Sequence, residues 1–534
     1  MRPLPALALA LVILLAGCGT GFQGTPAPAA TPDSTETAAP TAPGTPAPST
    51  PTGAETEAPT GTGTEAEPGT DTGAPSASGF DFADPPEDRL GWEDGLWYNE
   101  SLAITPEDGL NATELNATIA RAMARIEVVR ETEFTETVPV TVINRTTYRQ
   151  EFAGGDANYT PAFRAFDNTK FEAMFMIGEE RDALGVQNTN RGSNVLGFYS
   201  PPQDEIVVVS ESATPTLSTE FTLAHELVHA LQDQRFNLSE YRAPTRDAYN
   251  GQNGLIEGEA SLVEDRYRQR CAAGWSCLNV STGGGGGGGG DLHLGIYFVN
   301  FFPYSDGPGF VASVYRQGGW EAVDDLYADV PASAEQVIYP DRYGEDPPVD
   351  VSLSDSASGE WERVCPDAPR PGSLRPDYAT LGQSVLSSMF AYTLYDDYNS
   401  SRLVGPREWL NYDEDGNLNA SDPLNYDLPV TNGWEGDRMH VYANPETGPN
   451  QTAYVWRIAW ENATEAEEFA AGYRRLLAHW GGSRVSGSQD HWRIDSGPFA
   501  DSFYVEVDGD TVTIVNAPTR EDLGAVYDGY APPS

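Results

Sequence analysis

Apolar residues recur at helical spacing in two stretches near the middle of the chain. In residues 218–236 the recurring positions are Phe221, Ala224, Leu227, Val228 and Leu231. In residues 254–267 they are Leu255, Leu262, Val263 and Tyr267. Each pattern predicts a helix with one buried flank. Thr216 or Ser218 suits the capping position before the first helix.

The rest of the folded part alternates between helical and strand patterns. Helices are expected over residues 105–131, 291–327 with a break at 307–309, 381–395 and 464–479. Strands are expected over residues 138–143 and 453–460, and in hairpins over 197–209 and over 502–507 with 511–515. Together these patterns predict an α+β protein. By analogy with peptides that bind by strand addition, the strand near Ile206 to Val209 is expected to form a sheet edge that holds an extended substrate.

The first residues predict an export signal with a lipid anchor. Arg2 supplies the charged start, residues 4–16 are apolar, and Leu15-Ala-Gly-Cys18 matches a lipobox. Residues 1–18 are therefore expected to be a lipoprotein signal peptide with Cys18 as the lipid attachment point. The protein would then be anchored on the outer, extracellular face of the cell membrane. An ordinary cleaved signal with an incidental cysteine is the alternative.

Composition divides the remaining chain into a stalk and two folded units. Residues 19–85 are rich in Thr, Pro, Gly and Ala without apolar periodicity, which predicts a disordered linker. A first folded unit is expected over residues 86–410. A small α/β unit is expected over residues 411–534. The uninterrupted glycine run at 283–290 predicts a flexible surface insert.

The charge is strongly negative throughout the chain. The 534 residues include 80 acidic and 31 basic ones, for a formal charge of −49, and Lys170 is the only lysine. This balance is typical of halophilic proteins, whose acidic surfaces stay hydrated in concentrated salt. It excludes the basic face that nucleic-acid binding requires.

One five-residue run carries the candidate chemistry. His225-Glu226-Leu227-Val228-His229 puts two histidines one turn apart on the same face of the first predicted helix. Each imidazole can offer one nitrogen to Zn²⁺, and Glu226 can take a proton from a water at the open side of the metal. Two surface histidines on an amphipathic helix are the alternative interpretation. The glutamate in the required position argues against it.

This pattern resembles the gluzincin metallopeptidases, in which a glutamate on a downstream helix completes the ligand set. Glu257-Gly258-Glu259-Ala260 looks like their Glu-Gly-x-Ala segment. The resemblance implies a zincin-like metallopeptidase domain in which Glu257, rather than Glu259, is the third zinc ligand. Alternatively, both glutamates are part of an acidic surface.

A closer resemblance is to a poorly characterised family of secreted prokaryotic gluzincin-like proteins, many of them archaeal surface proteins. It rests on the extended metal motif, on Glu257 to Ala260, and on Pro331-Ala-Ser-Ala-Glu-Gln-Val-Ile-Tyr-Pro340. That family often has histidine where this chain has Tyr339. A tyrosine hydroxyl can donate a hydrogen bond to an oxyanion, which makes Tyr304 and Tyr339 candidate catalytic residues. The segment that contains Arg438 is also similar to the family, and Arg438 is a third candidate.

Two acidic residues are expected to contact the metal ligands. Asp233 lies one turn past His229, and Glu264 lies two turns past Glu257. Carboxylates at such positions orient metal-binding histidines.

The cysteines and glycosylation signals fit an exported protein. With Cys18 lipidated, the short spacing of Cys271 and Cys277 makes them the expected disulfide, which leaves Cys365. Asn-x-Ser/Thr signals are frequent, so the chain is a candidate glycoprotein.

The sequence favours a lipid-anchored extracellular zinc metallopeptidase, a hydrolase that acts on peptide or protein substrates. A cell-surface structural or adhesive lipoprotein with a non-catalytic metal site is the alternative from another class. A metallohydrolase that acts on bonds other than peptides is the third.

Overall fold

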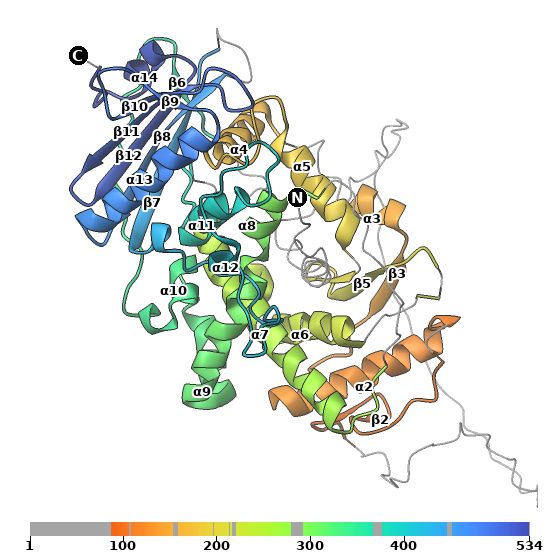
Figure 1. The fold of residues 1–534 in the computed structure, drawn as a ribbon. Helices are drawn as coiled ribbons and strands as arrows, with labels where there is room; N and C mark the ends of the chain where they lie inside the picture. The colour runs from red at the N-terminus through yellow and green to blue at the C-terminus, as the bar shows by residue number, and fades with distance from the viewer. Residues whose placement is uncertain are drawn as a thin grey trace, which may run out of the picture.

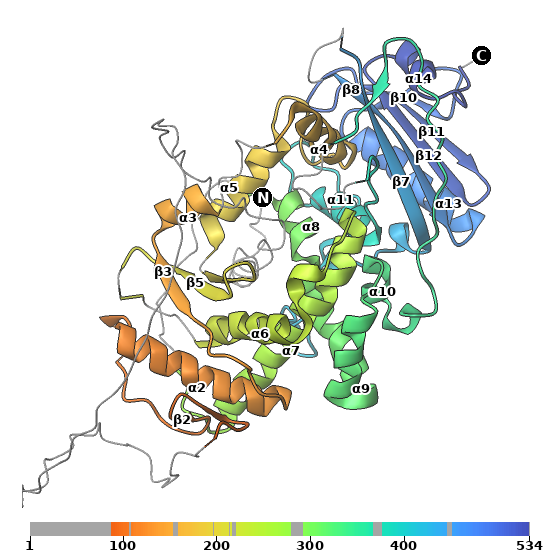
Figure 2. The same cartoon turned by 180° about the vertical axis from the view of Figure 1, so that it is seen from behind.

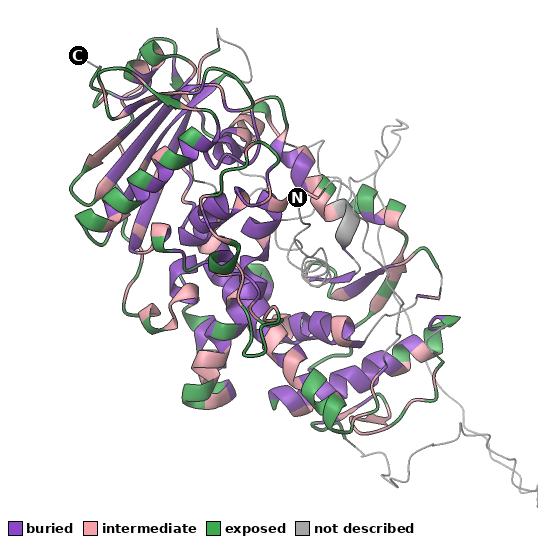
Figure 3. Ribbon diagram, viewed as in Figure 1, coloured by how far each residue is buried: buried purple, intermediate pink, exposed green. Residues whose placement is uncertain are grey.

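The chain forms a mixed α and β structure with a helical middle between two sheets. The computed structural model describes residues 87–105, 108–152, 159–195, 197–212, 214–215, 220–278, 292–366, 376–445 and 451–532. Figures 1 and 2 show the larger sheet at one end, and α2 (Ala112–Arg130) with the smaller sheet at the other. Buried residues are concentrated in the helices between them and in the strands of the larger sheet (Figure 3). The predicted α+β class is confirmed.

The smaller sheet stands beside the helix with the histidine motif. Its three strands, in the order β3-β5-β4, are β3 (Val140–Ile143), β5 (Glu205–Val209) and β4 (Gly197–Ser200). β3 pairs parallel to β5. β4 pairs antiparallel to β5 and is the first strand of the predicted hairpin. The expectation that residues 206–209 form the sheet edge is wrong, because β5 is the central strand. The strand that faces the histidine helix is β4.

Two helices form the centre of the molecule. α6 (Glu220–Phe236) carries the histidine motif, and α7 (Arg246–Ala273) carries Glu257. Both were predicted, although α7 begins eight residues earlier than expected. Thr216 and Ser218, the predicted capping residues of α6, lie outside the described residues.

Glycines let α7 pack closely against the helices that follow it. α8 (Leu294–Ser305) and α9 (Gly307–Asp325) meet at a break close to the one predicted. A β-carbon on Gly258 would lie 2.4 Å from the carbonyl oxygen of Gly307. Only glycine permits this contact between backbones. It brings the end of α8 next to the part of α7 that contains Glu257.

The larger sheet lies in the C-terminal part of the chain. Its seven strands, in the order β6-β7-β8-β12-β11-β10-β9, are β6 (Glu362–Arg363), β7 (Trp434–Ala443), β8 (Thr452–Trp460), β12 (Thr511–Ala517), β11 (Ser502–Asp508), β10 (His491–Arg493) and β9 (Ser483–Arg484). Alternate residues of β8 face opposite sides, as a strand requires. Trp456 joins the main core on the side of α13 (Ala463–His479), and Val455 joins a second core with α14 (Arg520–Val526). Since β6 belongs to this sheet, the sheet includes residues before the predicted boundary at 411.

The remaining elements are short or connect these parts. They are β1 (Trp92–Glu93), β2 (Leu96–Trp97), α3 (Arg145–Glu151), α4 (Pro161–Ala173), α5 (Ala183–Asn194), α10 (Ala334–Ile338), α11 (Gln383–Tyr392) and α12 (Pro406–Trp409). The helix expected over residues 105–131 begins at Ala112. Asn111 caps it, and Glu114 bonds back to the backbone of Asn111.

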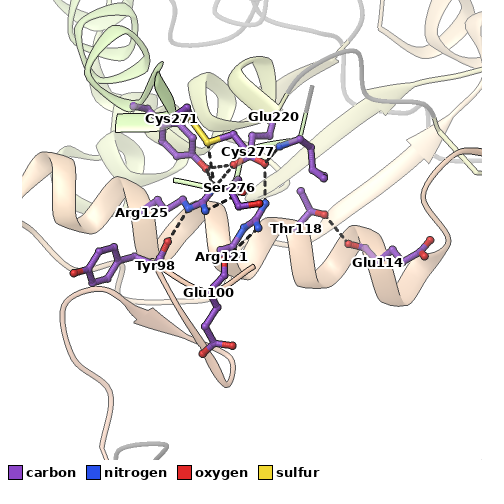
Figure 4. A network of polar contacts seen from close by, with 12 residues as sticks. Tyr98, Glu100, Glu114, Thr118, Arg121, Arg125, Glu220, Cys271, Ser276 and Cys277 are labelled. Atoms are coloured by element: carbon purple, nitrogen blue, oxygen red, sulfur yellow. Dashed lines mark hydrogen bonds and ion pairs between the residues drawn. A yellow bond between two sulfur atoms is a disulfide. The ribbon is translucent and has the colours of Figure 1, made fainter. Parts of the chain in front are cut away.

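A buried polar network joins α2 to the first turn of α6 (Figure 4). The carboxylate of Glu220 accepts from Arg121 at 2.8 Å and from Arg125 at 2.5 Å, and all three side chains are almost fully buried. Glu220 also accepts from the backbone N–H of Leu278 at 2.7 Å. The disulfide between Cys271 and Cys277 lies beside this network. The network therefore fixes the start of the histidine helix.

Several predictions fall outside the described residues. These are the signal peptide with Cys18, the stalk over residues 19–85 and the glycine run at 283–290. Cys365 is a free, exposed thiol. Among the helices of the described residues, none is both long and apolar enough to cross a membrane.

Candidate metal centre

α6 brings His225 and His229 together on one face. Their rings are 4.9 Å apart, and both residues are buried, with 3% of their surface exposed. Glu226 is also buried. The apolar flank of the helix, which includes Leu227, Val228 and Leu231, packs into the main core. Burial of this flank holds the helix so that the histidines face α7.

α7 places Glu257 against both imidazoles. Its Oε2 atom lies 3.3 Å from Nε2 of His225 and 3.1 Å from Nε2 of His229. Ligand atoms at about 2.0–2.1 Å from a tetrahedral zinc ion are about 3.3 Å from one another. Both distances match the spacing of ligands around one zinc ion, and the donor atoms of the three residues all lie within 4.8 Å of one another.

Glu259, the alternative ligand in the same segment, points to different partners. It forms a buried ion pair with Arg130 at 2.5 Å and accepts from the hydroxyl of Tyr327 at 2.5 Å. Its side chain therefore stabilises the contact between α2, α7 and the turn that follows α9. Of the two glutamates, only Glu257 is grouped with the histidines as a possible metal ligand.

The far nitrogens of both histidines have partners that fix the ring orientation. Nδ1 of His225 lies 3.2 Å from Oε2 of Glu264, and Nδ1 of His229 lies 2.8 Å from Oε1 of Gln232. If Nδ1 carries the proton in each ring, Nε2 is left with a lone pair that faces Glu257. Glu264 was predicted for this position.

Gln232, in contrast, was missed, and Asp233 was predicted in its place. The carboxylate of Asp233 accepts from the hydroxyl of Tyr199 at 2.9 Å and from the backbone of Leu238 at 2.7 Å. It therefore secures the end of α6 rather than an imidazole. Gln232 lies three residues after His229, a spacing at which side chains on a helix meet, so the sequence contained the signal.

The backbone of β4 holds Glu226. The N–H of Tyr199 donates to Oε2 of Glu226 at 2.9 Å. A backbone donor of this kind favours the charged carboxylate. The arrangement provides a buried proton acceptor next to the first histidine.

The three candidates for oxyanion stabilisation lie in different places. The ring of Tyr304, at the end of α8, stacks at 6.2 Å from the ring of His225. The hydroxyl of Tyr339 instead donates to Asp427 at 2.7 Å and accepts from Gln383 at 3.0 Å. Arg438 pairs with Asp350 at 2.5 Å, on the larger sheet. Of the three, Tyr304 is the one whose described contacts include a metal-site histidine.

The electrostatics of the three donor side chains suit a cation. Burial disfavours the charge of Glu257, but the charge of His229 and hydrogen bonds from both histidines lower the pKa of its carboxyl to about 2. Burial also disfavours a charged His229, but the charge of Glu257 outweighs it and raises the pKa of His229. Glu257 is therefore an anion in this site and attracts positive charge.

An unused oxygen also indicates a missing partner. Oε1 of Glu257 is buried and has no hydrogen-bond partner among the described residues. A buried carboxylate oxygen without a partner is costly, on the order of 1–3 kcal/mol or more. Two imidazoles and the carboxylate to which this oxygen belongs form a donor set that zinc prefers, once the imidazoles have given up the Nε2 protons with which they bind Glu257. The residues present therefore fit a zinc ion.

Comparisons with known proteins give no activity for the chain. Residues 370–527 match a family described as a domain of unknown function (DUF8575). This match covers the larger sheet except β6, and it begins after the three candidate ligands. Searches of curated proteins and of solved structures found no match.

Proposed function

We propose that the chain is a zinc metallopeptidase whose metal is held by His225, His229 and Glu257. One observation carries the proposal: Oε2 of Glu257 lies within 3.3 Å of Nε2 of both histidines, at the spacing of ligands around one zinc ion. The histidine motif on α6 and the glutamate on the next helix agree with the gluzincin resemblance. We therefore also propose that α6, α7 and the smaller sheet correspond to a zincin-like fold.

Glu226 has the position and chemistry of the general base. A bound zinc ion would act as a Lewis acid that activates a water molecule and polarises the peptide carbonyl. Glu226 would take the proton of that water and pass it to the leaving amine. The N–H of Tyr199 orients the carboxylate for this task. Glu264 and Gln232 keep the imidazole rings in place.

The site favours catalysis over a purely structural metal. A structural zinc site is closed by four protein ligands, whereas a catalytic site has three and an open position. Here two histidines and one glutamate form the group, and Glu226 is engaged by the backbone of β4. The alternative, a surface-structural or adhesive lipoprotein with a non-catalytic metal, needs no proton acceptor at this position.

The cellular setting is part of the proposal. The lipobox at Cys18 and the acidic composition favour a lipid-anchored protein on the outer cell surface, in a salty medium. Its substrates would be peptides or unfolded protein segments, because the site residues are only 1% to 3% exposed and a folded protein could not reach them.

Zinc content and peptide cleavage, measured together in molar salt, test the proposal. We expect about one zinc per chain in the wild type, little in His229→Ala, and cleavage only by the zinc-containing protein. His440→Asn is the matched control, because His440 is equally buried but lies on β7. A wild type without zinc would remove the site. A zinc-bound wild type that cleaves neither short peptides nor an unfolded protein would favour the structural alternative.

A further inference from the structure

A second group of acidic side chains lies far from the histidines, where α4 and its following turn meet the larger sheet. It consists of Glu172, Glu179 and Asp501, whose carboxylate oxygens lie within 4.8 Å of one another. Glu172 is the penultimate residue of α4, Glu179 lies in the turn that follows α4, and Asp501 comes just before β11. The backbone N–H of Glu179 donates to the carbonyl of Pro498 at 3.2 Å, and this bond holds the two segments together.

Among the described residues, no positive side chain forms an ion pair with these carboxylates. Glu172 is 8% exposed and Asp501 is 3% exposed. Arg493 acts on Asp501 electrostatically, but its guanidinium donates to Ser502 at 2.9 Å and to the carbonyl of Pro518 at 2.6 Å. Buried carboxylates in contact need a shared proton or a cation, because their repulsion in a low dielectric is large.

Another acidic cluster among the described residues, in contrast, includes an arginine that forms ion pairs with its carboxylates. Asp346 and Glu461 both bind the guanidinium of Arg342, and Glu435 lies beside them. That cluster has its cation in the form of an arginine. The Glu172 cluster has no such ion pair among the described residues.

Burial and mutual repulsion both disfavour charge on the carboxyl groups of the cluster. Burial, with the neighbouring charges of Asp501 and Glu179, raises the pKa of Glu172 well above its usual range. Burial and the charge of Glu179 raise the pKa of Asp501 to about 7. Without a cation, one carboxyl must therefore keep a proton near neutral pH.

An amide oxygen beside the cluster is also without a partner. Asn516, on β12, is 1% exposed, and its Nδ2 donates to Oδ2 of Asp501 at 2.9 Å. The carboxamide thus faces the cluster. Its Oδ1 is buried and has no hydrogen-bond partner among the described residues. Since amide oxygen and nitrogen can exchange places by a flip of the side chain, Asn516 can present an oxygen to a cation in the cluster.

We propose that Glu172, Glu179, Asp501 and Asn516 form a Ca²⁺ site that joins α4 to the larger sheet. Carboxylate and amide oxygens are the ligands that Ca²⁺ prefers, at about 2.3–2.6 Å. Oxygens on opposite sides of one such ion are about 4.6–5.2 Å apart, which accommodates the observed spacing. The ion would replace the shared proton and fix the contact between the turn after α4 and the loop before β11. This site is independent of the proposed zinc centre.

The test is Ca²⁺ binding by the full chain, first treated with a chelator and then kept in molar NaCl. Calorimetric titration with CaCl₂ alone measures affinity, and thermal unfolding with and without Ca²⁺ measures stabilisation. In the wild type we expect saturable Ca²⁺ binding and a raised Tm. In Asp501→Asn the Ca²⁺ affinity should be at least about tenfold lower than in the wild type, because affinity follows the number of charged ligands. Glu461→Gln, in the cluster paired with Arg342, should bind Ca²⁺ as the wild type does.

Two further variants make the result decisive. Glu179 is half-buried, so Glu179→Gln should fold even if Asp501→Asn does not. Glu179→Gln should also weaken Ca²⁺ binding. Glu257→Gln should lose zinc but keep Ca²⁺ binding, which separates this site from the proposed metal centre. A wild type whose Tm does not respond to Ca²⁺, or unchanged affinity in both Asp501→Asn and Glu179→Gln, would overturn the proposal in favour of a shared proton.

Discussion

The backbone N–H of Tyr199 donates to Oε2 of Glu226 at 2.9 Å, so strand β4 directly positions the carboxylate beside the first histidine of the metal centre. The hydroxyl of Tyr199 also donates to Asp233, the residue after Gln232 on α6. A single residue of β4 thus contacts α6 at two points. This contact couples the register of the smaller sheet to the geometry of the site.

Replacement of Glu226 by glutamine should abolish cleavage but retain zinc. Glutamine keeps an oxygen that can accept from Tyr199 but has no charge with which to take a proton. A positioned acid–base group contributes roughly 10²- to 10⁴-fold, and we expect a loss of that size. Peptide cleavage at equal zinc occupancy is the measurement. Glu335→Gln, a buried glutamate on α10, is the control. Equal rates in wild type and Glu226→Gln would exclude Glu226 as the base.

Replacement of Gly258 by alanine should destabilise the contact of α7 with α9. The new β-carbon would lie 2.4 Å from the carbonyl oxygen of Gly307, so the backbones must separate. Overpacking of this kind costs about 1–3 kcal/mol. Because Gly258 follows Glu257, we also expect weaker zinc binding. Urea unfolding and zinc affinity measure the two effects. Gly309→Ala is the matched control, since a β-carbon there meets nothing within 4 Å. Equal effects of the two substitutions would contradict the packing argument.

The elements around the metal centre could be predicted because their signals are local. The motif from His225 to His229 and the apolar flank of α6 lie within one helix. The early start of α7 could not be predicted in the same way. Gly251 and Gly254 have low helix propensity, but they pack against the carbonyl of Pro331 and the side chain of Val337. Tertiary packing therefore extends the helix where its own sequence disfavours it.

Contacts between distant segments were beyond the local patterns. The place of β5 in the centre of its sheet depends on parallel pairing with β3, about sixty residues earlier. No turn connects these strands, so no local pattern indicated their pairing, and the analogy with strand addition pointed to the wrong strand. The bond from Tyr199 to Glu226 follows from the same sheet arrangement. The sequence does contain the signal for the start of α2, because Asn111 and Glu114 form the sequence signature of a capping box.

Loss of the Glu220 carboxylate should strongly destabilise the protein. Glu220→Gln would leave Arg121 and Arg125 buried without their counter-charge. Removal of one partner from a buried ion network costs about 3–5 kcal/mol. Arg164→Met is the control, because the pair of Arg164 with Asp182 is 30% to 38% exposed and should be worth about 0–1 kcal/mol. Denaturant unfolding in constant salt compares them. Similar small losses in both variants would show that the network contributes little.

Stability should fall as the pH rises from about 5 to 9, partly because of Asp247. Its side chain is buried, accepts from the backbone of Ala334 at 2.9 Å, and faces the charge of Asp437. Burial, reinforced by Asp437, raises the pKa of Asp247 to about 8, against an ordinary value near 3.8. The folded state therefore holds a proton that the unfolded state releases. The resulting stabilisation is complete below about pH 4 and is lost as the pH passes through about 8.

Asp247→Asn should remove this part of the pH dependence. Asparagine is neutral at every pH and keeps an oxygen for Ala334, so the variant should lie closest to the wild type at pH 5 and exceed it most at pH 9. Burial also raises the pKa of Glu335 to about 8, so some pH dependence of stability remains in both proteins. Urea unfolding at pH 5, 7 and 9 in constant salt gives the comparison. Asp495→Asn, whose side chain is 84% exposed, is the control and should change neither slope nor stability. If Asp247→Asn shows the wild-type slope, Asp247 is ionised in the folded protein, and the buried proton belongs to another group.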